Sequence, residues 1–365
     1  MRRITSAILG ATMSLAALLA PGSGPQAATE DYYASKTLTV IVGLAAGGSA
    51  DTLVRMFTPY LRKHIPGEPN IVVQNMPGAG GVLSFNYIYE KAKPDGQTII
   101  FTLWDPLAQA FGNQGLRARY DQYEFLGGTG DIRVNYMRVD SAPGGAKKPA
   151  DVMKAKEAMV GAYATTDLSG ILAHLTLKTL GVPHKVVTGY RGGADVFLAL
   201  QRGEVNVHDT SLATYRTRSK SFITSGEGMP LCYLVPSDAQ GNFVKSAQVT
   251  EMPSFQELYR DVHGKLPSGE LWNAFNWMVQ QFSDLAHVAM APPGTPEAEL
   301  KVLRKAFVDA MNDPEFVAES TKRNGLPFDF VGVEHGKKVF EALSNVSPEI
   351  LATLRGSIDT MAGAK

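Results

Sequence analysis

The sequence predicts an α/β protein of two domains. Short runs rich in β-branched residues alternate with amphipathic helical segments over residues 36–103, and the alternation starts again near Pro143. In the first of these blocks, glycine-rich turns connect strand to helix. The chain has 365 residues, 44% of them hydrophobic and 19% charged, and is long enough to bury two cores of ordinary size.

The N-terminus has the pattern of a secretory signal peptide. Met1-Arg2-Arg3 precedes an apolar stretch over 8–19, and the small residues Ala27 and Ala28 follow. The alternative is a membrane anchor, but a spanning helix needs about 20 apolar residues and this stretch is shorter. No cysteine lies near the predicted cleavage region to carry a lipid. We therefore expect residues 1–28 to be removed and the mature protein to be free in the periplasm.

The first β-turn-α unit contains a candidate anion-binding turn. Residues 36–42 form the predicted strand, and residues 51–64 form a helix with one apolar face. A helix start leaves backbone N–H groups unpaired and carries partial positive charge, and glycine lets a ligand approach closely. The candidate residues of this turn are Ala46, Gly47, Gly48, Ser49 and Asp51. For Asp51 the alternative role is to cap the helix that follows.

A second unit repeats the pattern, with a predicted strand over 71–74 and a helix that ends before Pro94. The candidate residues of its turn are Gly78, Ala79, Gly80 and Gly81. Two such turns side by side would hold a carboxylate through backbone N–H groups. The alternative is that both are only tight turns in which glycine supplies a positive φ. Neither turn has the glycine spacing of a nucleotide-binding loop.

The next predicted strand, residues 97–103, runs into Trp104. Ligands of open α/β sheets lie beyond the carboxyl ends of the strands, so this indole could form the floor of a cleft. The alternative is that it packs in the core.

From Pro143 onward the pattern predicts a second α/β domain. Its predicted elements are helix 150–155, strand 158–163, helix 172–180, strand 185–188, helix 194–202 and strand 205–208. The single cysteine, Cys232, lies in an apolar run over 231–235 that is typical of a buried strand. One cysteine forms no internal disulfide, so we expect Cys232 to be a core residue.

Several motifs occur together in one known family. They are Ala45-Ala46-Gly47-Gly48 with Asp51, Pro77-Gly78-Ala79-Gly80-Gly81, Pro94-Asp95-Gly96, Gly189-Tyr190-Arg191-Gly192-Gly193-Ala194 and Ala291-Pro292-Pro293-Gly294-Thr295-Pro296. With these motifs the chain resembles the Bug-type binding proteins, which are the extracytoplasmic solute receptors of tripartite tricarboxylate transporters. The resemblance spans nearly all of the mature chain.

The resemblance implies a two-lobed periplasmic-binding-protein-like fold with a ligand cleft between the lobes. Lobe 1 would comprise residues 29–140 plus 250–365, and lobe 2 residues 141–249. The second-lobe residues that would face the ligand are Thr165, Thr166, Asp167, Tyr190, Arg191, Gly192 and Asp209. The loop before residue 170 departs from the family's Ser-x-x-His ending, because Asp167 stands near the serine position and Gly170 at the histidine. Segment 264–286 also differs from the family, and its role stays open.

The leading hypothesis is a periplasmic receptor that closes its lobes on a small organic acid and delivers it to membrane permease subunits. Charge-assisted hydrogen bonds from the two turns would hold a carboxylate without an arginine. One alternative is a secreted α/β enzyme such as a hydrolase, and another is a carboxylate-sensing subunit of a signalling system. The chain numbers 35 basic and 35 acidic residues, which does not indicate a nucleic-acid partner. We expect a monomer.

Catalytic and metal-binding motifs are missing from the sequence. It has no G-x-S-x-G elbow and no H-E-x-x-H pair, and its seven histidines are scattered. His208 beside Asp209 is the best candidate for chemistry, yet neighbours on a strand point to opposite faces. We therefore expect no enzymatic activity, no metal and no other cofactor.

Overall fold

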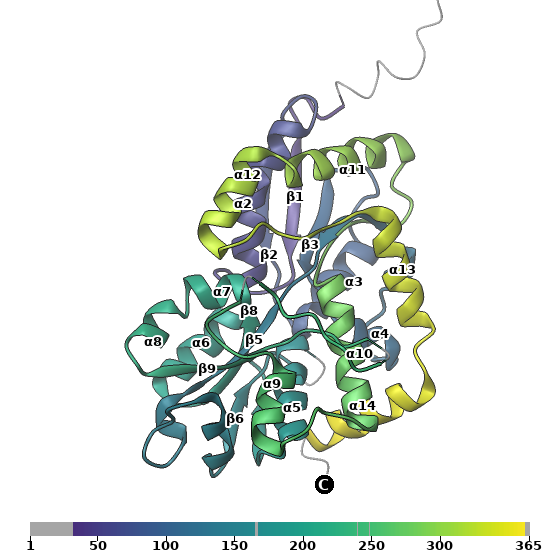
Figure 1. Cartoon of the computed structure of the whole chain (residues 1–365). Helices are drawn as coiled ribbons and strands as arrows, with labels where there is room; N and C mark the ends of the chain where they lie inside the picture. The colour runs from purple at the N-terminus through teal and green to yellow at the C-terminus, as the bar shows by residue number, and fades with distance from the viewer. Residues whose placement is uncertain (1–31, 165–166, 239, 248, 362–365) are drawn as a thin grey trace, which may run out of the picture.

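The computed structural model describes residues 32–164, 167–238, 240–247 and 249–361 (Figure 1). Within these ranges the chain forms two mixed β-sheets flanked by helices, which confirms the predicted α/β class. The predicted signal peptide, residues 1–28, lies outside the described residues. No helix in the described part of the chain is both long and apolar enough to cross a membrane.

The first sheet has six strands in the order β11-β4-β10-β3-β1-β2. Its strands are β1 (Thr37–Val42), β2 (Asn70–Asn75), β3 (Thr98–Leu103), β4 (Glu124–Thr129), β10 (His287–Ala291) and β11 (Phe330–Val331). β1 is parallel to β2 and β3, whereas β10 is antiparallel to β3 and β4. Val42 pairs with Asn75, so the two glycine-rich turns leave neighbouring strands at the same edge.

The second sheet has five strands in the order β7-β6-β8-β5-β9. Its strands are β5 (Arg133–Arg138), β6 (Ala158–Gly161), β7 (His184–Val187), β8 (Val207–Ser211) and β9 (Gly228–Tyr233). β6 is parallel to β7 and β8, and β5 is antiparallel to β8 and β9. Cys232 lies in β9 and is fully buried, which confirms the prediction of a core residue.

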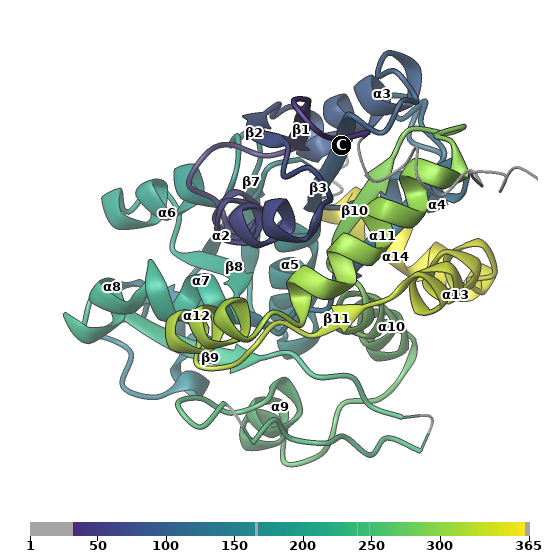
Figure 2. The same cartoon turned by 90° about the horizontal axis from the view of Figure 1, so that it is seen from above.

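Most helices belong clearly to one sheet (Figure 1). Around the first sheet lie α2 (Ser49–His64), α3 (Val82–Glu90), α4 (Pro106–Ala110), α11 (Glu297–Met311), α12 (Pro314–Asn324) and α13 (Val333–Ser344). Around the second lie α5 (Leu168–Leu180), α6 (Gly193–Arg202), α7 (Leu212–Thr217), α8 (Lys220–Thr224) and α9 (Phe255–His263). The predicted helix over 150–155 is instead a 3-10 helix, Pro149–Lys154. Each sheet and its helices are called one half of the protein. α7 and α12 lie side by side where the two halves meet (Figures 1 and 2).

α2 carries the first candidate turn, and its apolar face fixes its position on the sheet. Leu53, Phe57 and Leu61 are buried, as the periodicity predicts. The Phe57 ring lies 4.7 Å from the ring of Phe307, between centroids, and burial of one such side chain contributes about 1.5–3 kcal/mol. The helix ends because the residue before Pro66 is restricted to extended conformations.

The segment over 264–286 contains α10 (Glu270–Asp284), which packs against α5 and against the C-terminal helix α14 (Pro348–Met361). The Ser357 hydroxyl of α14 lies 3.1 Å from His174 Nε2 on α5, and Lys178 Nζ donates to the Thr360 hydroxyl over 3.0 Å. The last helix of the chain therefore returns to a helix of the second sheet.

β4 and β5 have no counterpart among the predicted strands. β4 ends in Gly127-Gly128-Thr129, a composition typical of a turn. A Cβ on Gly128 would lie 2.4 Å from the carbonyl oxygen of His287 on β10, so close strand packing requires glycine there. The predicted lobe bounds stay a prediction, but β5 pairs in the second sheet although it precedes the predicted boundary after residue 140.

Candidate functional site

The first candidate turn is held in shape by Asp51. The N–H of Gly47 donates to Asp51 Oδ2 over 2.7 Å, and Arg55 and Asn75 donate to Oδ1 over 2.9 and 3.0 Å. Burial opposes ionisation, but the hydrogen bonds from Arg55, Gly47 and Asn75 outweigh it and lower the pKa of Asp51. The Asp51 carboxylate thus stabilises the turn by accepting these hydrogen bonds, although it is not the N-cap of α2.

Backbone donors remain open at the start of α2. Gly48 is the N-cap, and no side chain of the described residues caps the helix. The N–H groups of Ser49 and Ala50 likewise form no hydrogen bond to other described residues. Unpaired N–H groups at the positive end of a 16-residue helix favour an anion.

The second candidate turn has an unusual backbone. Gly78, Ala79, Gly80 and Gly81 all have positive φ, of 158°, 48°, 68° and 102°. The N–H of Gly81 donates to the carbonyl oxygen of Gly78 over 2.9 Å, while those of Ala79 and Gly80 have no acceptor in the described ranges. At Gly80 the left-handed conformation favours glycine.

The turns of the first sheet contact loops of the second. The N–H of Ala45 donates to the carbonyl oxygen of Arg191 over 3.2 Å. A Cβ on Gly48 would lie 4.0 Å from the nitrogen of Gly193, which begins α6. A Cβ on Gly80 would lie 3.4 Å from the Cβ of Ala164. The starts of α2 and α6 therefore face each other.

Asp167 and Asp209, predicted to face a ligand, are both engaged within the second sheet's half. Asp167 caps α5: Oδ1 accepts from the N–H of Gly170 over 3.2 Å, and Oδ2 from the N–H of Tyr163 over 2.9 Å. Asp209 is fully buried in an ion pair with Arg133. Burial raises the pKa of Asp167 to about 6 and that of Asp209 to about 7, although Arg133 opposes the second shift. Their partners fit capping and ion pairing rather than ligand contact.

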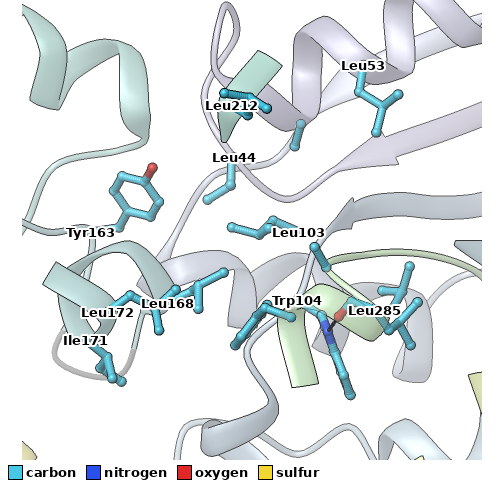
Figure 3. Packing of buried hydrophobic residues seen from close by; sticks show 14 of the residues in the cluster. Leu44, Leu53, Leu103, Trp104, Tyr163, Leu168, Ile171, Leu172, Leu212 and Leu285 are labelled. Atoms are coloured by element: carbon cyan, nitrogen blue, oxygen red, sulfur yellow. Dashed lines mark hydrogen bonds between the residues drawn. The ribbon is translucent and has the colours of Figure 1, made fainter. Parts of the chain in front are cut away.

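Trp104 is a core residue. Its side chain is 1% exposed, and its Nε1 donates to the carbonyl oxygen of Leu285 over 2.8 Å (Figure 3). Its ring contacts the rings of Tyr120 and Phe340. The packing alternative therefore accounts for this tryptophan.

The remaining second-lobe candidates divide into loop backbone and exposed side chains. Gly192 caps α6 beside the first turn, and a Cβ there would lie 3.2 Å from the nitrogen of Ala45. The side chain of Arg191 is 73% exposed and pairs with Asp195, while Tyr190 is half-buried. Thr165 and Thr166 lie outside the described residues.

The sequence of this chain resembles those of known bacterial proteins. No protein-family model matches the chain. A UPF0065 protein of Bordetella pertussis is 24% identical over 331 residues, which cover 86% of each chain. The protein BugT of the same organism is 32% identical over 96 residues, which cover 26% of this chain and 27% of BugT.

Among solved structures, the periplasmic binding protein BugD superposes with a TM-score of 0.63 at 19% identity, over 91% of this chain and 98% of BugD. The chain has the periplasmic-binding-protein fold. MatC from Rhodopseudomonas palustris with bound malate gives a TM-score of 0.63 at 20% identity, over 88% of this chain and 99% of MatC. R. palustris Rpa4515 with adipate gives a TM-score of 0.66 at 18% identity, over 90% of this chain and 97% of Rpa4515. The resemblance to Bug-type proteins that the motifs indicated is confirmed.

Within this periplasmic-binding-protein fold, a cavity of about 80 Å³ lies beside the start of α2. Its polar lining includes Ser49, Asp131, Thr214, His287 and Asn324. The Nε2 atom of His287 and the Nδ2 atom of Asn324 are buried without a hydrogen-bond partner in the described part of the chain. No motif in the sequence pointed to either residue, because they come from β10 and the end of α12, far from both turns in the chain.

Proposed function

We propose that this protein is a periplasmic solute-binding protein that captures a small organic carboxylate for a tripartite tricarboxylate-type transporter. The observation that carries the proposal is that the start of α2, with its open N–H groups, lies beside the start of α6. The neighbours MatC and Rpa4515, which hold malate and adipate, support the choice of ligand class. Closure of two lobes around the acid fits this architecture.

The proposal includes the finer expectations about partners and location. The protein would act as a monomer in the periplasm after loss of residues 1–28, and would deliver its ligand to membrane permease subunits. Structural neighbours described as periplasmic binding proteins or as periplasmic transporters support the location.

Enzymatic activity is not part of the proposal. Cys232 is fully buried, and burial raises the pKa of its thiol far above the ordinary range. His208 and His287 are buried as well, and burial lowers the pKa of each to about 3. His208 bonds to Tyr136 while Asp209 bonds to Arg133, so the two neighbours do not act together. Among the described residues, no group of three or more His, Cys, Asp or Glu side chains could hold a metal.

A thermal-shift screen of the mature protein tests the proposal. Malate, adipate, citrate and benzoate represent dicarboxylic, tricarboxylic and aromatic acids, and adipamide is an uncharged control. A ligand at 100-fold excess over its Kd stabilises the folded state by about 2.7 kcal/mol, which raises the melting temperature measurably. We expect at least one acid to do so and adipamide to have no effect. A melting temperature unchanged by every acid, with calorimetry showing no heat of binding, would contradict the proposal.

A further inference from the structure

Arg218 places a positive charge beside the first turn. It directly follows α7 at the junction of the two halves, and its Nη2 lies 3.6 Å from where a Cβ on Gly47 would be. Asp51 in the first half, and Tyr136 and Tyr163 in the second, lie near enough to affect the pKa of Arg218. The hydroxyl of Tyr163 lies 3.0 Å from where a Cβ on Gly193 would be, at the start of α6. The guanidinium therefore lies at the candidate site.

The guanidinium of Arg218 lacks a partner. Its Nη1 is buried and has no hydrogen-bond acceptor, and no ion pair joins it to an acidic side chain, within the residues that the structure describes. Other interior arginines differ: Arg133 pairs with Asp209, and Arg216 pairs with Glu251. Burying such a donor without an acceptor costs free energy. Burial accordingly lowers the pKa of Arg218.

The groups around Arg218 do not neutralise it. Asp51 attracts it, but the carboxylate of Asp51 already accepts from the Gly47 N–H, Arg55 and Asn75. Burial raises the pKa of Tyr163 to about 12, so its hydroxyl is uncharged at neutral pH. The starts of α2 and α6 add two positive helix ends to the same place. Three positive groups thus converge where an anion would balance them.

We propose that Arg218 forms a bidentate ion pair with the carboxylate that binds at the start of α2. This inference rests on the proposed function and extends it, because it makes the ligand's negative charge, and not only its shape, a condition of binding. A planar guanidinium offers two parallel N–H donors that match the two oxygens of a carboxylate. The inference departs from the expectation that backbone donors hold the carboxylate without an arginine.

Calorimetry on four variants tests the inference, with the acid that binds most tightly among malate, adipate, citrate and benzoate. Arg218→Met removes the charge at similar length, and Arg218→Gln does the same with a polar group should the Met variant fail to fold. Arg218→Lys keeps the positive charge but loses the planar guanidinium with its two parallel N–H donors. The control is Arg202→Met at the far end of α6, where Arg202 is 58% exposed and pairs with Glu204.

We expect Arg218→Met and Arg218→Gln to weaken binding by about 10-fold or more, since a hydrogen bond to a charged group contributes that much. Arg218→Lys should recover part of the lost affinity, and Arg202→Met should bind as the wild type does. Without ligand, Arg218→Met should melt no lower than wild type, because it removes a partly buried charge that has no partner among the described residues. Wild-type affinity in the uncharged variants, or no recovery in Arg218→Lys, would overturn the inference alone. Failure of the wild type to bind any of the acids would overturn the proposed function instead.

Discussion

Gly48 and Gly80 both lie in the turns of the candidate site, but their backbone conformations differ. Gly48 has φ −72° and ψ 178°, a conformation open to any residue, whereas Gly80 has φ 68°. The conformational freedom of glycine is therefore required only at Gly80. At Gly48 the constraint is space, because a Cβ would lie 3.3 Å from the carbonyl oxygen of Ala45.

This difference leads to a prediction about substitution. Gly80→Val should lower the free energy of unfolding by about 1–2 kcal/mol and abolish acid binding, because valine is strained at positive φ. Gly48→Ala should melt near the wild-type temperature and bind more weakly, because its methyl group points toward the start of α6. Thermal unfolding and calorimetry measure both effects. Unchanged affinity in a folded Gly80→Val variant would show that the second turn does not hold the ligand.

At the scale of single elements, Asp313 joins two helices of the first half. It caps α12 by accepting from the N–H of Glu315 over 2.9 Å, and it accepts from Lys63 and His64 at the end of α2 over 3.0 and 2.8 Å. Its side chain is 2% exposed. Burial opposes the charge, but the hydrogen bonds from His64 and Lys63 outweigh it and lower the pKa of Asp313 to about 2.

Asp313→Ala should therefore lower the free energy of unfolding at pH 7 by about 1–2 kcal/mol, from loss of the cap and its charged partners. Because the pKa is lower in the folded state than the unfolded value of about 3.9, the stabilisation is complete above about pH 4. It should disappear as the pH falls from about 4 to about 2. Urea unfolding of both proteins across this range measures the difference. Asp309→Ala, which removes only a surface pair with Lys305, serves as the control and should change stability by less than about 1 kcal/mol.

Strands and helices with a regular hydrophobic pattern were predictable from the sequence. The strand before the first turn and the helix after it occupy nearly the predicted residues, because β-branched runs and an amphipathic face are local properties. β4 was not predicted, because its glycines are required by packing against β10, a strand about 160 residues later in the chain. Arg218 was not predicted as a site residue for a similar reason. Its lack of a partner among the described residues depends on the folded site and not on the residues near it in the sequence.

For the whole molecule, the two halves are seen in contact. The hydrogen bond from Ala45 to Arg191 and the approach of Gly48 to Gly193 bring positive helix ends together. We expect this arrangement to be favoured by a bound anion and the halves to separate in its absence. Small-angle X-ray scattering should then give a smaller radius of gyration for the mature protein saturated with its acid than for the free protein. An identical radius in both states, with binding verified by calorimetry, would contradict closure around the ligand.

The packing of α14 on α5 also means that one contact of the second half forms late in folding. α5 belongs to the second sheet and is made early, whereas α14 ends the described chain. Nearly the whole polypeptide, which is exported under the proposed function, must therefore reach the periplasm before Ser357 can contact His174. A chain that ended before Pro348 would keep the residues of both sheets and of both turns, but His174 and Lys178 of α5 would lose their partners on α14.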